Sequence, residues 1–358
     1  MTTFISGLEL NKSFYQEVVK PILEANFSGL RYSAALIGYG SDVLGFDTPI
    51  STDHEWGPRL LLFLSEADYE KYKVEIDDTL SKKLPYIFRG FSTNFSSGNI
   101  QWQEPISSGL VNHKIWILTI ASFFKLSLNF SPYSKIKTLD WLTFPEQKLL
   151  EITSGKVYYD GLRELNPIRA KFNYYPKDIW LYLLSVQWLA IAQEEAFLGR
   201  CGDIGDELGS QLIAARTIHK LMKLCFLMER RYAPYSKWFG KAFTQLSCAK
   251  RLAPIFENIL VANYWKQREE QMSQAYEIIA RMHNNLCLTS PLETKVIDYY
   301  DRPYRVIHAN RFARAIRDTI GKEKVRNLPN FGAIDQLVNN TDVLEQPQLC
   351  QKLKAMFI

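Results

Sequence analysis

Two acidic residues, Asp53 and Glu55, stand one residue apart shortly before the apolar run Leu60 to Leu64. If this segment is an extended strand, side chains alternate between its faces, so both carboxylates point the same way. Neighbouring carboxylates repel each other unless a positive charge lies between them. A divalent cation is the usual partner, and Mg²⁺ prefers a few carboxylates together with phosphate oxygens. The acidic pair therefore predicts a magnesium site.

A turn of small residues, Gly40 and Ser41, precedes this pair and follows the apolar run Ala34 to Ile37. Such a turn can offer backbone N–H groups and a hydroxyl to a phosphate group. The turn and the acidic pair together predict a site for a metal-bound nucleoside triphosphate.

These residues resemble the signature of the nucleotidyltransferase superfamily of the polymerase-β type, in which a Gly-Gly or Gly-Ser turn precedes Asp-x-Asp or Asp-x-Glu on a strand. Three further segments look like a bacterial nucleotidyltransferase-like family of unassigned function: Asp53 to Arg59, Gly199 to Asp206, and Glu229 to Trp238. The resemblance covers nearly the whole chain. The layout is also similar to that of the aminoglycoside nucleotidyltransferases.

The resemblance implies that Asp53 and Glu55 hold one or two Mg²⁺ ions that bridge the triphosphate. It implies that Gly40 and Ser41 bind the β- and γ-phosphates. Arg59 could reach a phosphate or be an ordinary exposed arginine. Without the resemblance, the two acids could equally be polar residues on the wet face of an edge strand.

The superfamily usually adds a third carboxylate on a later strand. The strand expected from His113 to Ile120 contains no acid, and Trp116 stands where the carboxylate is expected. Three options stay open: a general base from elsewhere, catalysis with two carboxylates, or a binding protein that has lost catalysis.

A replacement base could come from Glu194 or Glu195, which follow an apolar helical pattern. Adjacent helical positions diverge by about 100°, so at most one of them faces a cleft. In the antibiotic-modifying enzymes that the layout resembles, a helical domain contributes such acids. The alternative is that one glutamate points to solvent while the other caps the helix or pairs with Arg200.

Two later motifs have a functional and a structural interpretation. The segment Arg200 to Asp206 could line the same cleft or could be a helix-linking turn with capping aspartates. Arg231 and Lys237 stand among aromatic residues and could bind phosphates, as a lysine does in the antibiotic-modifying enzymes. Otherwise they belong to an ion-pair network between helices.

Composition excludes several classes of protein. The 358 residues are 47% hydrophobic and 23% charged, with a net charge of +5 and no basic tract, which argues against nucleic acid as a partner. We find no apolar run long enough to span a membrane and no signal-peptide pattern. The five widely spaced cysteines indicate reduced thiols and hence a cytoplasmic protein. The oligomeric state is left open.

Periodicity predicts an α+β fold with two domains. Residues 8–26 and 65–84 are typical of helices, with Ser65 as an N-cap, and residues 33–39 and 60–64 of strands. Residues 91–105 are expected to form loops. Long helical patterns dominate from about residue 139, at 177–198, 208–230, 235–255, 256–286 and 306–320. We therefore expect a nucleotidyltransferase-type mixed sheet with helices over residues 1–135 and an all-helical bundle over 136–358 that closes the cleft.

The leading functional hypothesis is Mg²⁺-dependent transfer of a nucleoside monophosphate. AMP from ATP is the first choice, and another nucleoside triphosphate stays open as the donor. The acceptor is expected to be a hydroxyl of a small molecule, with release of pyrophosphate. Two alternatives stay open: a catalytically impaired nucleotide-binding or interaction protein of the same fold, and a nucleotidyltransferase that modifies protein or tRNA.

Overall fold

The computed structural model describes residues 4–357, which divide into two compact units. The first comprises the residues up to Lys135 together with Lys148–Asn173, and the second comprises Ile136–Gln147 and the residues from Tyr174 onward. Segment 148–173 thus packs with the first unit. The expected domain ranges 1–135 and 136–358 stay a prediction.

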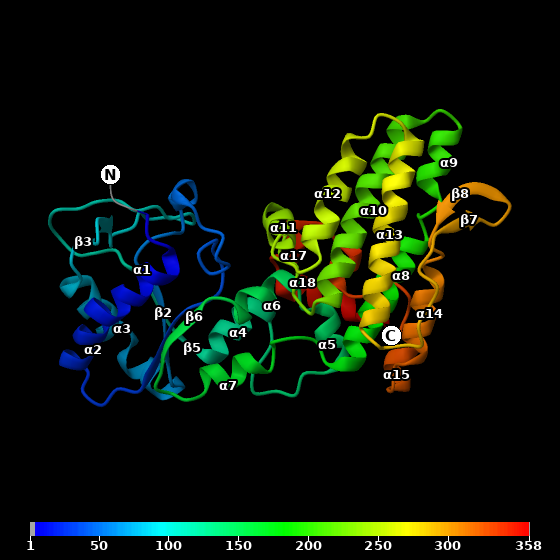
Figure 1. Ribbon diagram of the computed structural model, residues 1–358. Helices are drawn as coiled ribbons and strands as arrows, with labels where there is room; N and C mark the ends of the chain where they lie inside the picture. Colours follow the sequence, from blue (N-terminus) through cyan, green and yellow to red (C-terminus); the bar gives the residue numbers. More distant parts are fainter. Residues whose placement is uncertain (1–3, 358) are drawn as a thin grey trace. The chain divides into compact units, whose positions relative to one another are not determined.

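The first unit contains the following elements, which Figure 1 shows. They are α1 (Gly7–Phe14), a π-helical turn (Tyr15–Val19), α2 (Lys20–Asn26), β1 (Tyr32–Leu36), a 3₁₀ turn (Pro49–Thr52), β2 (Arg59–Leu64), α3 (Glu66–Lys83), β3 (Ile87–Phe88), β4 (Phe91–Ser92), β5 (Lys114–Thr119), α4 (Ile120–Leu128), most of α6 (Glu146–Thr153), β6 (Lys156–Asp160) and α7 (Leu165–Ala170).

A four-stranded mixed sheet with the order β5-β2-β1-β6 organises this unit. Strand β1 is antiparallel to β2 and to β6, whereas β2 and β5 are parallel. The register places Arg59 beside Lys114 and Leu61 beside Trp116. Because side chains alternate along a strand, this register brings two cations to the same face of the sheet.

The opposite face of the sheet forms the core against the N-terminal helices. Leu60, Leu62 and Ile115 are buried there with side chains of α1 and α3. Each fully buried side chain of this size contributes about 1.5–3 kcal/mol. Helix α3 begins as the sequence predicts, since the Ser65 hydroxyl accepts a hydrogen bond from the N–H of Asp68.

The second unit is mainly helical. Its elements are α5 (Thr138–Thr143), α8 (Lys177–Ala192), α9 (Phe197–Asp203), α10 (Glu207–Met228), α11 (Ser236–Phe243), α12 (Ala249–Val261), α13 (Trp265–Asn285), β7 (Ile297–Tyr299), β8 (Arg302–Val306), α14 (Asn310–Asp318), α15 (Glu323–Arg326), α16 (Ile334–Leu337), α17 (Thr341–Leu344), α18 (Pro347–Lys352) and a 3₁₀ turn (Leu353–Phe357).

The α+β class with a mixed sheet and a helical C-terminal region is confirmed. The structure differs from the expected all-helical bundle by the hairpin of β7 and β8. It also divides the helix expected over residues 256–286 between α12 and α13. Within residues 4–357, no helix combines the length and apolar character needed to cross a bilayer.

Candidate functional site

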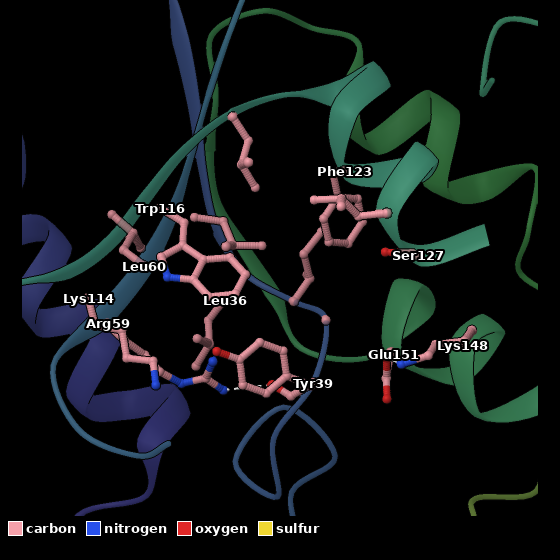
Figure 2. A pocket seen from close by; sticks show the side chains of 15 residues that line it. Leu36, Tyr39, Arg59, Leu60, Lys114, Trp116, Phe123, Ser127, Lys148 and Glu151 are labelled. Atoms are coloured by element: carbon pink, nitrogen blue, oxygen red, sulfur yellow. Dashed lines mark hydrogen bonds and ion pairs between the residues drawn. The ribbon is translucent and has the colours of Figure 1, made fainter. Parts of the chain in front are cut away.

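A cavity of about 290 Å³ opens on the face of the sheet that carries Arg59 and Lys114 (Figure 2). All of its lining belongs to the first unit. The lining residues are Leu36 of β1, then Ile37, Gly38 and Tyr39 after it, Arg59, Leu60 and Leu61 of β2, Lys114, Trp116 and Leu118 of β5, Phe123, Leu126 and Ser127 of α4, and Lys148 and Glu151 of α6.

Aromatic side chains dominate one part of this cavity. The rings of Tyr39 and Trp116 lie 5.6 Å apart between centroids, at an interplanar angle of 52°. Trp116 remains 41% exposed, so a ligand can reach its ring. Phe123 on α4 also lines the cavity (Figure 2). Rings arranged in this way can stack on a planar aromatic ligand.

Arg59 is held by Asp42 rather than exposed. Its Nε lies 3.1 Å from Asp42 Oδ2, and its Nη2 lies 2.6 Å from Oδ1 and 2.8 Å from the Tyr39 carbonyl oxygen. Both side chains are buried. The alternative of an ordinary exposed arginine is therefore wrong.

Gly40 makes room for this ion pair. Its backbone has a φ of +128°, and a Cβ at this position would lie 2.3 Å from both Arg59 Nη2 and Asp42 Oδ1. Because Gly40 has no side chain, the Arg59 guanidinium and the Asp42 carboxylate can approach its backbone closely. Ser41 lies beside it, half-buried, in the same turn.

Asp53 and Glu55 do not lie on a strand, so the expectation of an extended segment is wrong. A 3₁₀ turn over Pro49–Thr52 leads into a loop, and β2 begins only at Arg59. Glu55 has a φ of 54°, which is incompatible with a strand. Alternation of side chains along a strand therefore gives no reason for the Asp53 and Glu55 carboxylates to point the same way.

The two acids have separate partners. Asp53 is exposed, and its carboxylate lies 2.9 Å from His54 Nδ1, an interaction that lowers the pKa of Asp53. Glu55 accepts hydrogen bonds from the Tyr39 hydroxyl and the Gln101 N–H, both at 2.9 Å. It also forms an ion pair with the ammonium of Lys114.

Lys114 is the main feature that sequence reasoning missed. Its side chain is 2% exposed, and its ammonium lies 5.5 Å from the Phe95 ring centroid as well as against Glu55. Burial lowers the pKa of Lys114 to about 8, opposed by the negative charge of Asp42. The sequence shows this lysine on the strand that lacks the expected acid, but no local signal indicates its partner.

These residues do not fit the implied Mg²⁺ site. Asp53 is engaged by His54, and Glu55 already has a cation, Lys114, against its carboxylate. In the described part of the chain, no group of three or more His, Cys, Asp or Glu side chains is placed to hold a metal ion. Arg59 and Lys114, cations of the chain itself, line the cavity, and each is paired with a carboxylate.

Glu194 and Glu195 lie in the second unit, both buried. Glu194 forms ion pairs with Arg216 and, at 2.5 Å, with Lys220. Glu195 accepts hydrogen bonds from the N–H groups of Ile307 at 3.0 Å and Ala309 at 3.1 Å. Neither Glu194 nor Glu195 points to solvent. A catalytic role for either glutamate stays a prediction.

Glu195 should make stability depend on pH. Burial raises its pKa from an ordinary 4.5 to about 7, so the folded state binds more protons between these values. The stability that protonated Glu195 confers is complete below pH 4.5 and is lost as pH rises through 7. In urea unfolding, wild type should lose up to roughly 3 kcal/mol over this range relative to Glu195→Gln. A difference between the two proteins that does not change with pH would contradict this assignment, and Glu257→Gln, at an exposed helical site, provides the control.

The remaining predicted residues are also in the second unit. Arg231 follows α10 and is exposed, and Lys237 on α11 places its ammonium 5.2 Å from the Trp238 ring centroid. Neither Arg231 nor Lys237 forms an ion pair with any other residue in the range 4–357. The ion-pair network between helices that was the alternative for them therefore does not include these two residues. Asp206 caps α10 by accepting from the Gly209 N–H at 2.7 Å, as its structural interpretation predicts.

The family model described as "Domain of unknown function (DUF4037)" matches residues 141–239, a segment that includes α8, α9 and α10. No curated protein matches the chain. A crystal structure of a nucleotidyltransferase-like protein from Exiguobacterium sibiricum 255-15 is similar over 87% of this chain and 89% of that one, at 9% identity and a TM-score of 0.32.

Proposed function

We propose that the first unit binds a nucleotide without a pre-formed metal site. The base would stack against Trp116 and Tyr39, and the phosphates would lie toward Lys114. The observation that carries the proposal is the ion pair of Lys114 with Glu55, because the chain's own cation neutralises a carboxylate that a metal ion would otherwise need. This favours the hypothesis of a nucleotide-binding protein over that of an active transferase.

The charge and the lining of the site support this assignment. Burial strengthens the electrostatic attraction between Lys114 and an anion, because the local dielectric constant is lower than that of water. Binding cavities of small ligands are mostly apolar and carry a few fixed polar groups. Trp116 and Lys114 line the same cavity and match these two requirements.

Calorimetric titration with non-hydrolysable ATP, CTP, GTP and UTP analogues tests the proposal. At least one analogue should bind equally well in Mg²⁺ and in EDTA. Trp116→Ala should weaken binding roughly 10-fold, because stacking of a base on an aromatic ring contributes about 1–3 kcal/mol. Trp102→Ala provides a matched control, because Trp102 is also exposed but does not line the cavity. Absence of binding, or binding in Mg²⁺ alone, would overturn the proposal.

Mg²⁺-dependent transfer of AMP to a small-molecule hydroxyl is the second candidate. One observation favours it: Tyr39 both lines the cavity and donates to Glu55, so a carboxylate lies close to the proposed nucleotide site. Pyrophosphate release from ATP should then require Mg²⁺ and an acceptor and be abolished by Asp53→Asn. Such a result would replace the binding proposal with the transferase hypothesis.

A further inference from the structure

A separate cavity of about 600 Å³ lies in the second unit beside α10. Three basic residues of this helix line it: Arg216, Lys220 and Lys223. Their spacing of four and three residues places them on one face of the helix. Amide side chains from other segments complete the polar lining: Gln187, Gln193, Asn330, Gln336 and Asn339.

Positive charge exceeds negative charge along this face. Arg216 and Lys220 share a single carboxylate, that of Glu194. Lys223 donates to the main-chain carbonyl of Asp335. Burial raises the pKa of the Asp335 carboxyl, which weakens the one acidic side chain that lines the cavity.

His219 lies on the same face of α10, between Arg216 and Lys220 in sequence, and the neighbouring charges affect its pKa. Burial lowers its pKa to about 4, and the charges of Lys223 and Lys220 add to the effect. The imidazole is therefore uncharged at neutral pH and can accept or donate a hydrogen bond.

A second cavity of about 300 Å³ adjoins this one and shares His219, Lys223 and Asp335 with it. Hydrogen-bonding side chains line this extension as well, among them Tyr235 and Ser236. Cations of α10 line the combined space on one side. The extension adds the carboxyl groups of Glu146 and Glu345, which can accept hydrogen bonds from hydroxyl groups. This is the lining expected for a ligand with one anionic group and several hydroxyl groups.

We infer that this cavity binds a small organic phosphate. The phosphate group would lie against Arg216, Lys220 and Lys223, since guanidinium and ammonium groups form charge-assisted hydrogen bonds with phosphate oxygens. The amide side chains of Gln193 and Asn339 would bind the hydroxyl groups, whereas Gln187 and Gln336 hydrogen-bond each other. The inference concerns the second unit alone and does not rest on the nucleotide site of the first unit.

Ribose 5-phosphate is a suitable probe for calorimetric titration, with inorganic phosphate and ribose as its two halves. The wild-type protein should bind the ester more tightly than either half. Lys220→Met and Arg216→Met should each weaken binding roughly 10- to 100-fold, because each removes a hydrogen bond to a charged group. Lys220→Arg should retain most of the affinity, whereas loss of affinity in this variant too would indicate a structural defect.

Lys241→Met provides the matched control, because Lys241 is an exposed lysine on α11 that lines neither cavity. A second measurement follows the His219 imidazole by NMR, since a phosphate bound nearby should raise its pKa. The inference would be overturned if the wild type bound no ester, or if both Met variants, shown to be folded, bound it as well as Lys241→Met does.

Discussion

Asp42→Ala is expected to lower the free energy of unfolding by about 3–5 kcal/mol, because it leaves the buried Arg59 guanidinium without its counter-ion. Arg59 is 4% exposed, and Asp42 accepts two hydrogen bonds from it. The Tyr39 carbonyl would remain as a partner but carries no full charge. Urea unfolding followed by circular dichroism measures the loss.

Two further variants separate the effect of an unpaired charge from that of lost packing. The double variant Asp42→Leu with Arg59→Met should recover much of the stability, because well-packed apolar residues often replace a buried ion pair without loss. Asp78→Ala is the control for removing a carboxylate, since Asp78 is exposed and its ion pair with Lys82 is long, at 3.9 Å. A loss below about 1 kcal/mol in Asp42→Ala would contradict the assigned role.

Elements with strong local patterns could be predicted from the sequence. Helix α3 has an N-cap serine and an acidic first turn, and β2 and β5 are apolar runs with flanking turns. Strand β6 was missed because its residues are only partly buried or exposed, so its pattern carries no clear alternation. Its strand conformation depends on pairing with β1, a segment more than a hundred residues earlier.

The candidate site likewise depends on contacts between segments that are far apart in the sequence. Two residues named from the sequence, Arg59 and Glu55, lie at or beside the cavity together with Tyr39 and Lys114. The sequence assigned the charges to a metal and a phosphate, whereas the fold pairs them with one another. Glu55 and Lys114 are 59 residues apart, and no local periodicity reports a contact between a loop and a strand at that separation.

Lys114→Asp is expected to give the first unit a response to divalent cations that the wild type lacks. The substitution removes the internal cation and places a second carboxylate near Glu55. Two carboxylates in a partly buried site repel each other, so the variant without added ions should be less stable by about 3 kcal/mol or more. Mg²⁺ or Mn²⁺ would relieve this repulsion, since oxygen ligands suit both ions.

Thermal unfolding with increasing Mn²⁺ measures this response. At an ion concentration 100 times the dissociation constant, binding to the folded state alone should stabilise the variant by about 2.7 kcal/mol. Lys114→Met and the double variant Lys114→Asp with Glu55→Gln should show little response, because each lacks one of the two carboxylates. An equal Mn²⁺ response in wild type and Lys114→Asp would mean that Lys114 does not exclude the ion. No response in either protein would mean that the carboxylates of residues 55 and 114 do not converge, and that the position of the loop around Glu55, rather than the charge of Lys114, prevents a metal site.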